Sequence, residues 1–310
     1  MKAIQFFAIT ALGAALFASC SNEEELATGS YPSDNLIRVT AGVNNDMTRS
    51  DEAVTPTSLT KDFSLTVVNN TNNNFSYANE IFSPKGTEWS CGKNLLWQNL
   101  TTPVEIVALY PAAANTFSGV YSKENKSYGT ITYGVNSDQS TAAEADDLLL
   151  YHSANFVPEK NLENGKLDIQ FNHAFCRVDI EVIIGTEFNA STGLAANPIK
   201  GIKVGGTQIA ADISFASAET TFTPTGDAAS ITPTPGTFTQ ATSSAAKAVA
   251  RYSCIVIPQT ADLNIVLHTS DREFEWNGTK MTLESGKQYT LQLNMKKSAT
   301  ARKFILRERK

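Results

Sequence analysis

The sequence predicts an all-β protein made of two β-sandwich domains. Apolar and polar residues alternate with a period of two along most of the chain, which is the pattern of half-buried strands. Connections rich in Gly, Asn, Pro and Thr separate these short runs, and helical patterning is scarce outside Thr141 to Leu150. The chain has 310 residues, which is the length of about two such domains.

The composition fits packed domains and disfavours two other classes of protein. Apolar residues make up 42% of the chain and charged residues 18%, which argues against wholesale disorder. The net charge is -6, whereas a general nucleic-acid binder carries the opposite sign. No apolar run reaches the ~18 residues of a membrane helix, so we expect no helical membrane domain and no nucleic-acid partner.

The N-terminus has the pattern of a secretory signal. Lys2 precedes the uncharged apolar stretch Ala3 to Phe17, and small residues stand before Cys20. The run 16–20, Leu-Phe-Ala-Ser-Cys, resembles a bacterial lipobox, although Phe17 replaces the commoner Leu. That resemblance implies that residues 1–19 are a lipoprotein signal peptide and that the Cys20 thiol is acylated, with palmitate among the chains that anchor it. The alternative is an ordinary signal peptide with a chance cysteine.

Residues 20–35 read as an acidic tether. Ser21 and Asn22 are followed by Glu23, Glu24 and Glu25. Such a cluster resembles the surface-export signal of some Gram-negative lipoproteins. A solvated tether that no receptor reads is the alternative.

The first domain is predicted at 36–157. Residues 37–43 alternate strictly, as do residues 63–67. Residues 104–110 form a more continuous apolar run that ends at Pro111, which indicates a more deeply buried strand. A boundary is expected at 157–166, where Pro158, Asn161, Asn164 and Gly165 cluster as turn formers.

The second domain is predicted at 158–310 and ends in a short basic tail. Alternation changes parity between residues 167–171 and residues 176–182, so a bulge or bend is expected near His173 to Phe175. Further strands are expected at residues 254–257, 263–267 and 289–295. Two low-complexity stretches, residues 69–74 and 220–242, are expected to be a loop tip and a long surface connection.

Recognisable catalytic and metal-binding patterns are missing, so the sequence indicates neither an enzyme nor a cofactor or metal site. The chain has only three histidines, and none lies in a metal-binding pair. His173 is interpreted as a structural histidine bonded to backbone. Trp89, Trp97 and Trp276 are interpreted as packing residues, with a sugar-stacking platform as the alternative. Cys176 and Cys254 are interpreted as buried free thiols, with a disulfide between them as the alternative.

Several short motifs follow one another between residue 20 and about residue 295. They are Ile37-Arg38-Val39-Thr40-Ala41 leading to Met47-Thr48-Arg49-Ser50, the strand Val104 to Tyr110 ending in Tyr110-Pro111, Asp147-Leu148-Leu149 ahead of Phe171-Asn172-His173-Ala174, Ile257-Pro258-Gln259, and Gly286-Lys287-Gln288-Tyr289. Each motif is short, but the set and its order resemble the fimbrillin family, the type V pilins and Mfa-like lipoproteins of Gram-negative anaerobes.

The resemblance implies two tandem transthyretin-like Greek-key β-sandwich domains and a mode of assembly. The subunit is exported to the outer membrane as a lipoprotein, and an Arg-specific protease removes its N-terminal strand. The vacated groove then accepts a strand from the next subunit, which gives a head-to-tail polymer. The candidate cleavage residues are Arg49, which is preferred, and Arg38. The displaced strand would present Ile37, Val39, Ala41 and Val43.

The expected function is therefore a structural or adhesive subunit of cell-surface fimbriae, with other subunits and the protease as partners. The alternative is an unpolymerised surface lipoprotein that acts as an adhesin or glycan-binding module. The C-terminus departs from a stalk subunit, because residues 304–306 are its one strongly apolar stretch. A donor strand should offer several alternating apolar residues.

Overall fold

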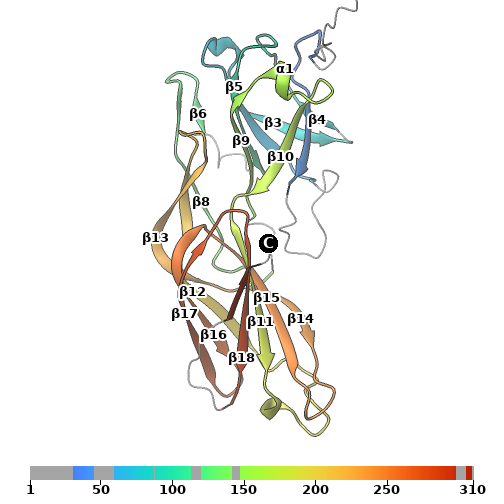
Figure 1. The fold of residues 1–310 in the computed structure, drawn as a ribbon, viewed down its shortest axis with the longest axis vertical. Coiled ribbons are helices and arrows are strands. Elements are labelled where there is room, and N and C mark those ends of the chain that lie inside the picture. The colour runs from blue at the N-terminus through green and yellow to red at the C-terminus, as the bar shows by residue number, and fades with distance from the viewer. Residues whose placement is uncertain are drawn as a thin grey trace, which may run out of the picture.

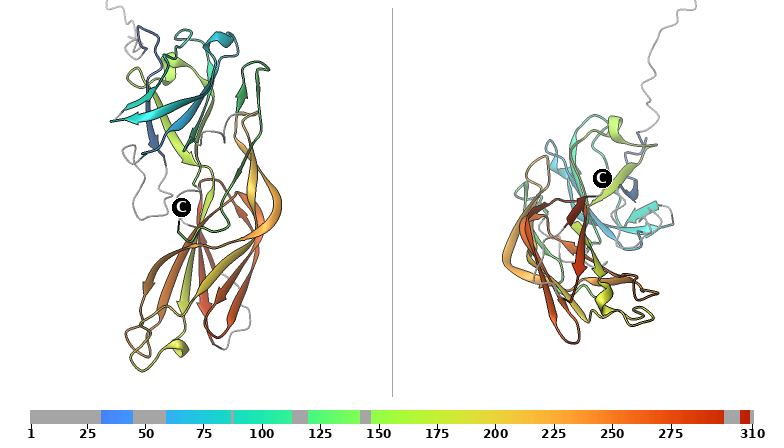
Figure 2. Two further views of the ribbon diagram at one scale, coloured as in Figure 1. Left: turned by 180° about the vertical axis from the view of Figure 1, so that it is seen from behind. Right: turned by 60° about the horizontal axis from the view of Figure 1, so that its bottom comes forward.

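Strands make up nearly all the regular structure of the chain, which confirms the predicted all-β class. The computed structural model describes residues 31–44, 59–86, 88–112, 120–141, 147–297 and 305–308. Two lobes stack along the long axis, with the N-terminal lobe at the top of Figure 1, and the same stacking is seen from behind in Figure 2. The described helices are all short: α1 (Pro158–Asn161) and the 3-10 turns Asn73–Phe75 and Thr186–Phe188.

The N-terminal lobe is a closed barrel of seven strands. Its order around the barrel is β1-β10-β9-β5-β2-β3-β4, so strands far apart in sequence lie side by side. The strands are β1 (Val39–Val43), β2 (Phe63–Val68), β3 (Tyr77–Lys85), β4 (Glu88–Cys91), β5 (Val104–Tyr110), β9 (Leu149–Phe156) and β10 (Leu167–His173). A small hairpin of β6 (Tyr121–Ser122) and β7 (Ser127–Tyr128) follows the barrel strand β5.

The C-terminal lobe is built from two sheets that enclose one core. One sheet has the order β14-β15-β11-β18-β19, and the other has the order β13-β12-β16-β17 with β8 also paired to β12. The strands are β8 (Ile131–Gly134), β11 (Cys176–Ile184), β12 (Gly201–Ser214), β13 (Thr221–Ile231), β14 (Thr234–Thr239), β15 (Ala248–Val256), β16 (Gln259–His268), β17 (Glu273–Leu283), β18 (Gln288–Met295) and β19 (Ile305–Glu308).

Aromatic residues fill the centre of the barrel. Phe63 on β2 is fully buried and lies 5.3 Å from Phe82, 4.8 Å from Trp89 and 5.6 Å from Phe171, measured between ring centroids. These pairs are stacked or edge-on, the arrangements that aromatic rings favour. Phe63 therefore joins β2, β3, β4 and β10 into one packed unit.

Strand β5 contributes side chains to both cores. Ile106 and Ala108 point into the barrel, whereas Val107 and Leu109 belong to the core of the C-terminal lobe. The alternation of a strand accounts for this, because successive side chains leave opposite faces. Because β5 is buried on both faces, the run that begins at Val104 is apolar with little alternation.

A polar contact also crosses between the lobes. His152 on β9 lies 2.9 Å from the Glu105 carboxylate on β5 and 3.1 Å from the hydroxyl of Thr220, beside the start of β13. The His152 side chain is 4% exposed. The contact of His152 with Thr220 therefore joins the two lobes in addition to the shared apolar strand.

The expected boundary at 157–166 is not where the chain passes from the core of the barrel to the core of the C-terminal lobe. That segment contains α1 and a turn at positive-φ Asn164 and Gly165, but it connects β9 to β10, both of which are barrel strands. The chain first contributes β8 to the C-terminal lobe, returns to the barrel with β9 and β10, and re-enters the C-terminal lobe after His173, where the alternation changes parity. The predicted bend is thus present, and it marks the passage from the barrel to β11.

Two segments differ from the sequence prediction. Residues 220–242, expected to be a surface connection, contain β13 and β14. Most of these side chains are half-buried or exposed, so the strands carry no apolar alternation. In the segment expected to be helical, residues 149 and 150 begin strand β9, and residues 142–146 lie outside the described part.

Candidate functional site

The N-terminal strand β1 lies in the barrel wall between β10 and β4. It pairs in parallel with β10 over its whole length, from Val39 opposite Leu167 to Val43 opposite Phe171. The ladder continues past both ends of the strand. The Leu167 amide donates to the Arg38 carbonyl at 2.8 Å, and the Asn44 amide donates to the Phe171 carbonyl at 2.8 Å.

The inner face of β1 supplies apolar side chains to the barrel core. Ile37, Val39 and Ala41 are buried at 8%, 2% and 3% exposure, and Val43 is half-buried against the same core. The structure therefore brings together the four residues that the sequence predicts for a displaced strand. Arg38 and Thr40 alternate with them and are less buried.

The opposite edge of β1 is bonded less continuously. Among the described residues, its pairing with β4 is a single bridge, between Val39 and Trp89. Just before the strand, the Ile37 amide donates to the Leu95 carbonyl at 2.9 Å. An open cleft of about 200 Å³ lies along this seam. Its lining includes Arg38, Val39, Trp89, Cys91, Asn94 and Lys166.

A side-chain network fixes the register of β1 on β10. The Thr40 hydroxyl donates to one Asp168 carboxylate oxygen at 2.7 Å, and the Gln170 amide group donates to the other at 2.6 Å. Thr40 and Asp168 are directly opposite each other in the ladder. A slip of one residue would break this bond and turn the apolar face of β1 outward.

Arg38 is exposed and is held by a neighbour in sequence. Its guanidinium donates two bonds to the Asp34 carboxylate, at 2.9 and 2.6 Å, and its side chain is 45% exposed. Arg38 precedes the first residue of β1, so a cut on its C-terminal side would leave the strand in place. The other candidate cleavage residue, Arg49, and the candidate lipidation residue, Cys20, lie outside the described residues.

The Asp34–Arg38 pair gives a testable titration. The hydrogen bonds from Arg38 are the main cause that lowers the pKa of Asp34 to about 2. Because the folded-state pKa lies below the unfolded value, the pair is present at neutral pH and is lost as pH falls towards 2. We expect the Asp34 carboxyl carbon to titrate near that value by NMR.

The matched variant for this titration is Arg38→Gln, which keeps a polar, hydrogen-bonding side chain at residue 38 and removes its charge. We expect the Asp34 pKa to rise towards its ordinary value in this variant. An unchanged titration would show that Arg38 is not the cause of the shift.

Removing β1 would open the barrel lengthwise. The unpaired edge of β10 would face the seam at β4, and the aromatic cluster around Phe63 and Trp89 would lose its cover. Unpaired backbone groups beside an apolar slot are the elements of a strand-acceptor groove. Without β1, the barrel would therefore present an unpaired strand edge beside an uncovered apolar core.

His173 is paired with a carboxylate. The Nδ1 atom of buried His173 lies 3.0 Å from the Asp147 carboxylate, rather than being bonded to backbone as expected. The Ser285 hydroxyl donates to the His173 carbonyl and not to its ring. No group of three or more metal-ligating side chains occurs among the described residues.

The tryptophans and cysteines are core residues. Trp89, Trp97 and Trp276 are 8%, 2% and 3% exposed, so they pack and form no exposed sugar-stacking platform. Cys176 and Cys254 are buried free thiols, and burial raises the pKa of the Cys176 thiol. The described part of the chain contains no helix with the length and apolar character needed to cross a membrane.

Comparison with known proteins gives a family and a fold. The fimbrillin-like family model matches residues 33–304. A candidate cell adhesion protein of Bacteroides uniformis superposes with a TM-score of 0.58 at 14% identity, covering 88% of this chain and 96% of that one. A candidate cell adhesion protein of Bacteroides ovatus gives 0.58 at 12% identity, covering 89% and 96%. No curated protein sequence matches the chain.

Proposed function

We propose, because the chain belongs to the fimbrillin-like family, that it is a structural or adhesive subunit of cell-surface fimbriae. The family match spans residues 33–304, so it includes both lobes and the strand β1. A structural role in the fimbria accounts for the extended, two-lobed β architecture without an enzymatic step. Both lobes would be variants of the transthyretin-like Greek-key sandwich, the first of them closed into a barrel by β1.

Export as a lipoprotein is the second part of the proposal. Residues 1–19 would be the signal peptide, and lipid on Cys20 would anchor the precursor to the outer membrane. The acidic residues 23–25 would lie in the tether between the anchor and the barrel. Two or three acyl chains bury enough methylene groups to hold a protein firmly at a membrane.

Assembly by strand exchange is the third part, and the position of β1 is the observation that carries it. The strand fills the barrel wall between β10 and β4, and its one continuous ladder is with β10. A cut after Arg49 would fall beyond Val43 and release β1 as a unit. A strand from the next subunit would then pair with β10 and cover the aromatic core, so that contacts repeat head to tail.

The test is the N-terminus and intact mass of the protein recovered separately from sheared fimbriae and from the remaining cell surface, compared between two matched variants. For the parent and for Arg38→Lys, we expect chains that begin at Ser50. Lysine keeps the charge at residue 38 but removes an Arg-specific site. For Arg49→Lys we expect chains that begin at acylated Cys20 and do not enter the polymer.

Two results would contradict parts of this proposal. Polymerised chains that begin at acylated Cys20 would exclude strand removal, because β1 would still be present. Recovery of acylated chains from the cell surface, with none in sheared fimbriae or at their base, would exclude the fimbrial role. The chain would then be an unpolymerised surface lipoprotein.

A further inference from the structure

The arginines of the two lobes are held differently from the lysines. Each arginine whose side chain is described forms an ion pair with a carboxylate. The pairs are Arg38 with Asp34, Arg177 with Asp179, Arg251 with Glu181 and Arg272 with Asp271. Among the described lysines, Lys93 and Lys166 alone form such a pair. The difference bears on processing, because the protease of the proposed maturation recognises arginine.

Three of these arginines are also protected by backbone pairing. Arg177 on β11 is paired with both β15 and β18. Arg251 on β15 is paired with β11, and the Arg38 carbonyl accepts a hydrogen bond from the Leu167 amide of β10. A protease must bind the chain on both sides of the bond that it cuts. A bond within a ladder is therefore accessible only after the ladder opens locally.

Arg272 lies outside the strand ladders. It is in the turn between β16, which ends at His268, and β17, which begins at Glu273. Its side chain is 44% exposed, and the two residues before it are exposed as well. Proteolytic cuts concentrate at exposed loop tips. The bond between residues 272 and 273 is therefore more accessible to a protease than bonds within the central strands.

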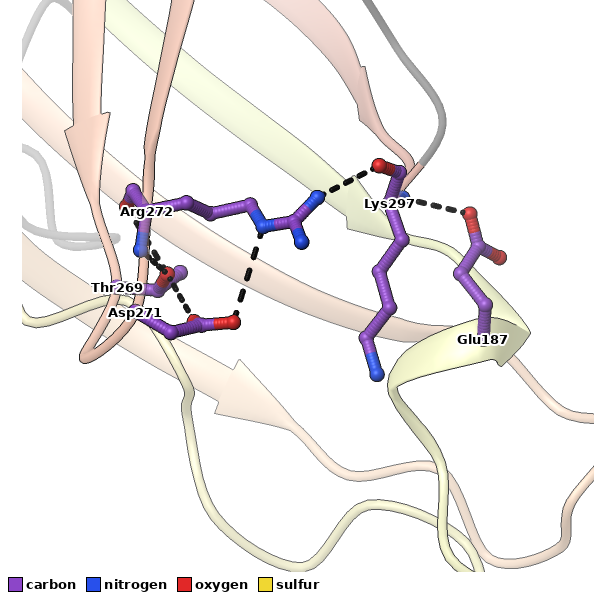
Figure 3. Close-up of polar contacts among 5 residues, drawn as sticks. All are labelled: Glu187, Thr269, Asp271, Arg272 and Lys297. Atoms are coloured by element: carbon purple, nitrogen blue, oxygen red, sulfur yellow. Dashed lines mark hydrogen bonds and ion pairs between the residues drawn. The ribbon is translucent and has the colours of Figure 1, made fainter.

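The Arg272 guanidinium is held from two directions, as Figure 3 shows. Its Nη1 group donates to the Lys297 carbonyl at 2.7 Å, and its Nε atom lies 3.7 Å from the Asp271 carboxylate. Lys297 is itself fixed, because its amide donates to the Glu187 carboxylate at 3.0 Å. The guanidinium is thus bound both to its own turn and to the segment that follows β18.

The rest of the turn supports this arrangement. The Thr269 hydroxyl lies 2.9 Å from the Asp271 carboxylate and accepts a bond of 3.2 Å from the Arg272 amide. The Arg272 guanidinium also lies 5.9 Å from the ring centroid of Phe274, within the range of a cation–π contact. Asp271 therefore contacts both the hydroxyl that closes the turn and the charge that a protease must bind.

These contacts compete with recognition by a protease. Proteases of the trypsin type bind an arginine side chain through a carboxylate in their specificity pocket. We propose that Asp271, together with the Lys297 carbonyl, withholds Arg272 from the Arg-specific protease of the proposed maturation. The exposed turn is then spared, while the N-terminal segment is cut after Arg49. The inference rests on the proposed function and adds to it a residue that determines which arginine the protease uses.

The rate of cleavage at this turn tests the role of Asp271. The purified full chain is treated with an arginine-specific endoprotease, and intact mass follows the fragment that begins at Glu273. The test variant is Asp271→Asn, which keeps a side-chain oxygen for Thr269 and removes the charge. We expect this fragment to form about two- to fivefold faster than in the parent, which is the range that an exposed ion pair supplies.

Two other carboxylates serve as matched controls. Asp262→Asn makes the same change of charge on β16 of the same hairpin, where Asp262 is opposite Lys280 rather than an arginine. It should leave the rate unchanged. Asp179→Asn removes the partner of Arg177, whose bonds lie within two ladders. No fragment that begins at Val178 should form, which separates protection by the backbone from protection of the side chain.

A lysine-specific endoprotease distinguishes withholding of the side chain from a change in the hairpin itself. Lys280 lies on β17 of the same hairpin, so cutting after it reports how often the hairpin opens. This rate should be the same in the parent and in Asp271→Asn. An equal acceleration of both cuts would mean that Asp271 acts by stabilising the turn, and the proposal would be wrong.

The proposal would also be overturned if the fragment from Glu273 formed at the same rate with and without the Asp271 charge. Both measurements use purified protein, so neither depends on fimbriae. Fimbrial chains that begin at acylated Cys20 would remove the protease from the proposed function and leave these rates unchanged. The two proposals therefore fail separately.

Discussion

Replacing Phe63 by alanine should lower the free energy of unfolding of the barrel by about 3–5 kcal/mol. Phe63 is fully buried and contacts rings on β3, β4 and β10. Truncation would therefore leave a cavity that four strands border, in addition to the lost burial of the ring. Denaturant unfolding in a Trp276→Phe background would measure it, since Trp89 and Trp97 then report from the barrel alone.

The control for Phe63 is Ile81→Ala on the neighbouring strand β3. Ile81 is 41% exposed, so its truncation should change the free energy of unfolding by no more than about 0.5 kcal/mol. A loss below about 1 kcal/mol for Phe63→Ala would mean that the barrel core collapses around the cavity. The central role given to this ring would then be wrong.

Replacing Gly206 by alanine should destabilise the C-terminal lobe by about 2–5 kcal/mol, from backbone strain and overpacking together. Gly206 in β12 has φ of +90°, which L-residues rarely adopt. A Cβ at this position would lie 2.0 Å from the Asp262 carbonyl oxygen of β16. The backbone of one strand would have to move, because the atoms nearest to this Cβ are backbone atoms and not the end of a flexible side chain.

Gly226→Ala on β13 separates the two causes. Gly226 has φ of +78°, but a Cβ there would meet no atom within 4 Å. Its substitution should cost about 1–2 kcal/mol, from the backbone conformation alone. Denaturant unfolding followed by circular dichroism would compare the variants, and equal losses would rule out the close approach of β12 to β16 as a cause.

Strands buried on one face could be predicted from sequence because burial leaves a period of two. The run at residues 176–182 alternates in the sequence, and β11 shows the same alternation of buried and half-buried side chains. Strands β13 and β14 could not be found this way, since most of their residues are half-buried or exposed. Their Thr-rich composition predicts a surface connection, but it is equally compatible with an edge strand.

Alternation does not specify which strands pair with each other. Strand β10 reads as a strand, but nothing local indicates that it pairs with β1, whose residues lie more than a hundred positions earlier. The turn formers at 158–165 predicted a boundary, whereas long-range pairing keeps β10 in the barrel. Alternation identifies the face that a strand buries and leaves its neighbours open.

The candidate site was predictable to the same extent. Alternation identified the residues of β1 that enter the core, from Ile37 to Val43. It did not identify the contact of Thr40 with Asp168 or the cleft at the β4 seam, because both depend on which strands lie beside β1. The Asp34–Arg38 pair has a helix-like spacing, but it spans a turn in which Asn35 has a φ of +57°, so the rule for helix pairs does not predict it.

The burial of β5 on both faces has a mechanical consequence. Tension that displaces β5 disturbs both lobes, because Ile106 and Val107 are neighbours that belong to different cores. Pulling β5 out of register would rupture two interiors at once. Because the two cores share one strand, the molecule resists stretching as a unit. This property suits a protein that must keep its length under load at a cell surface.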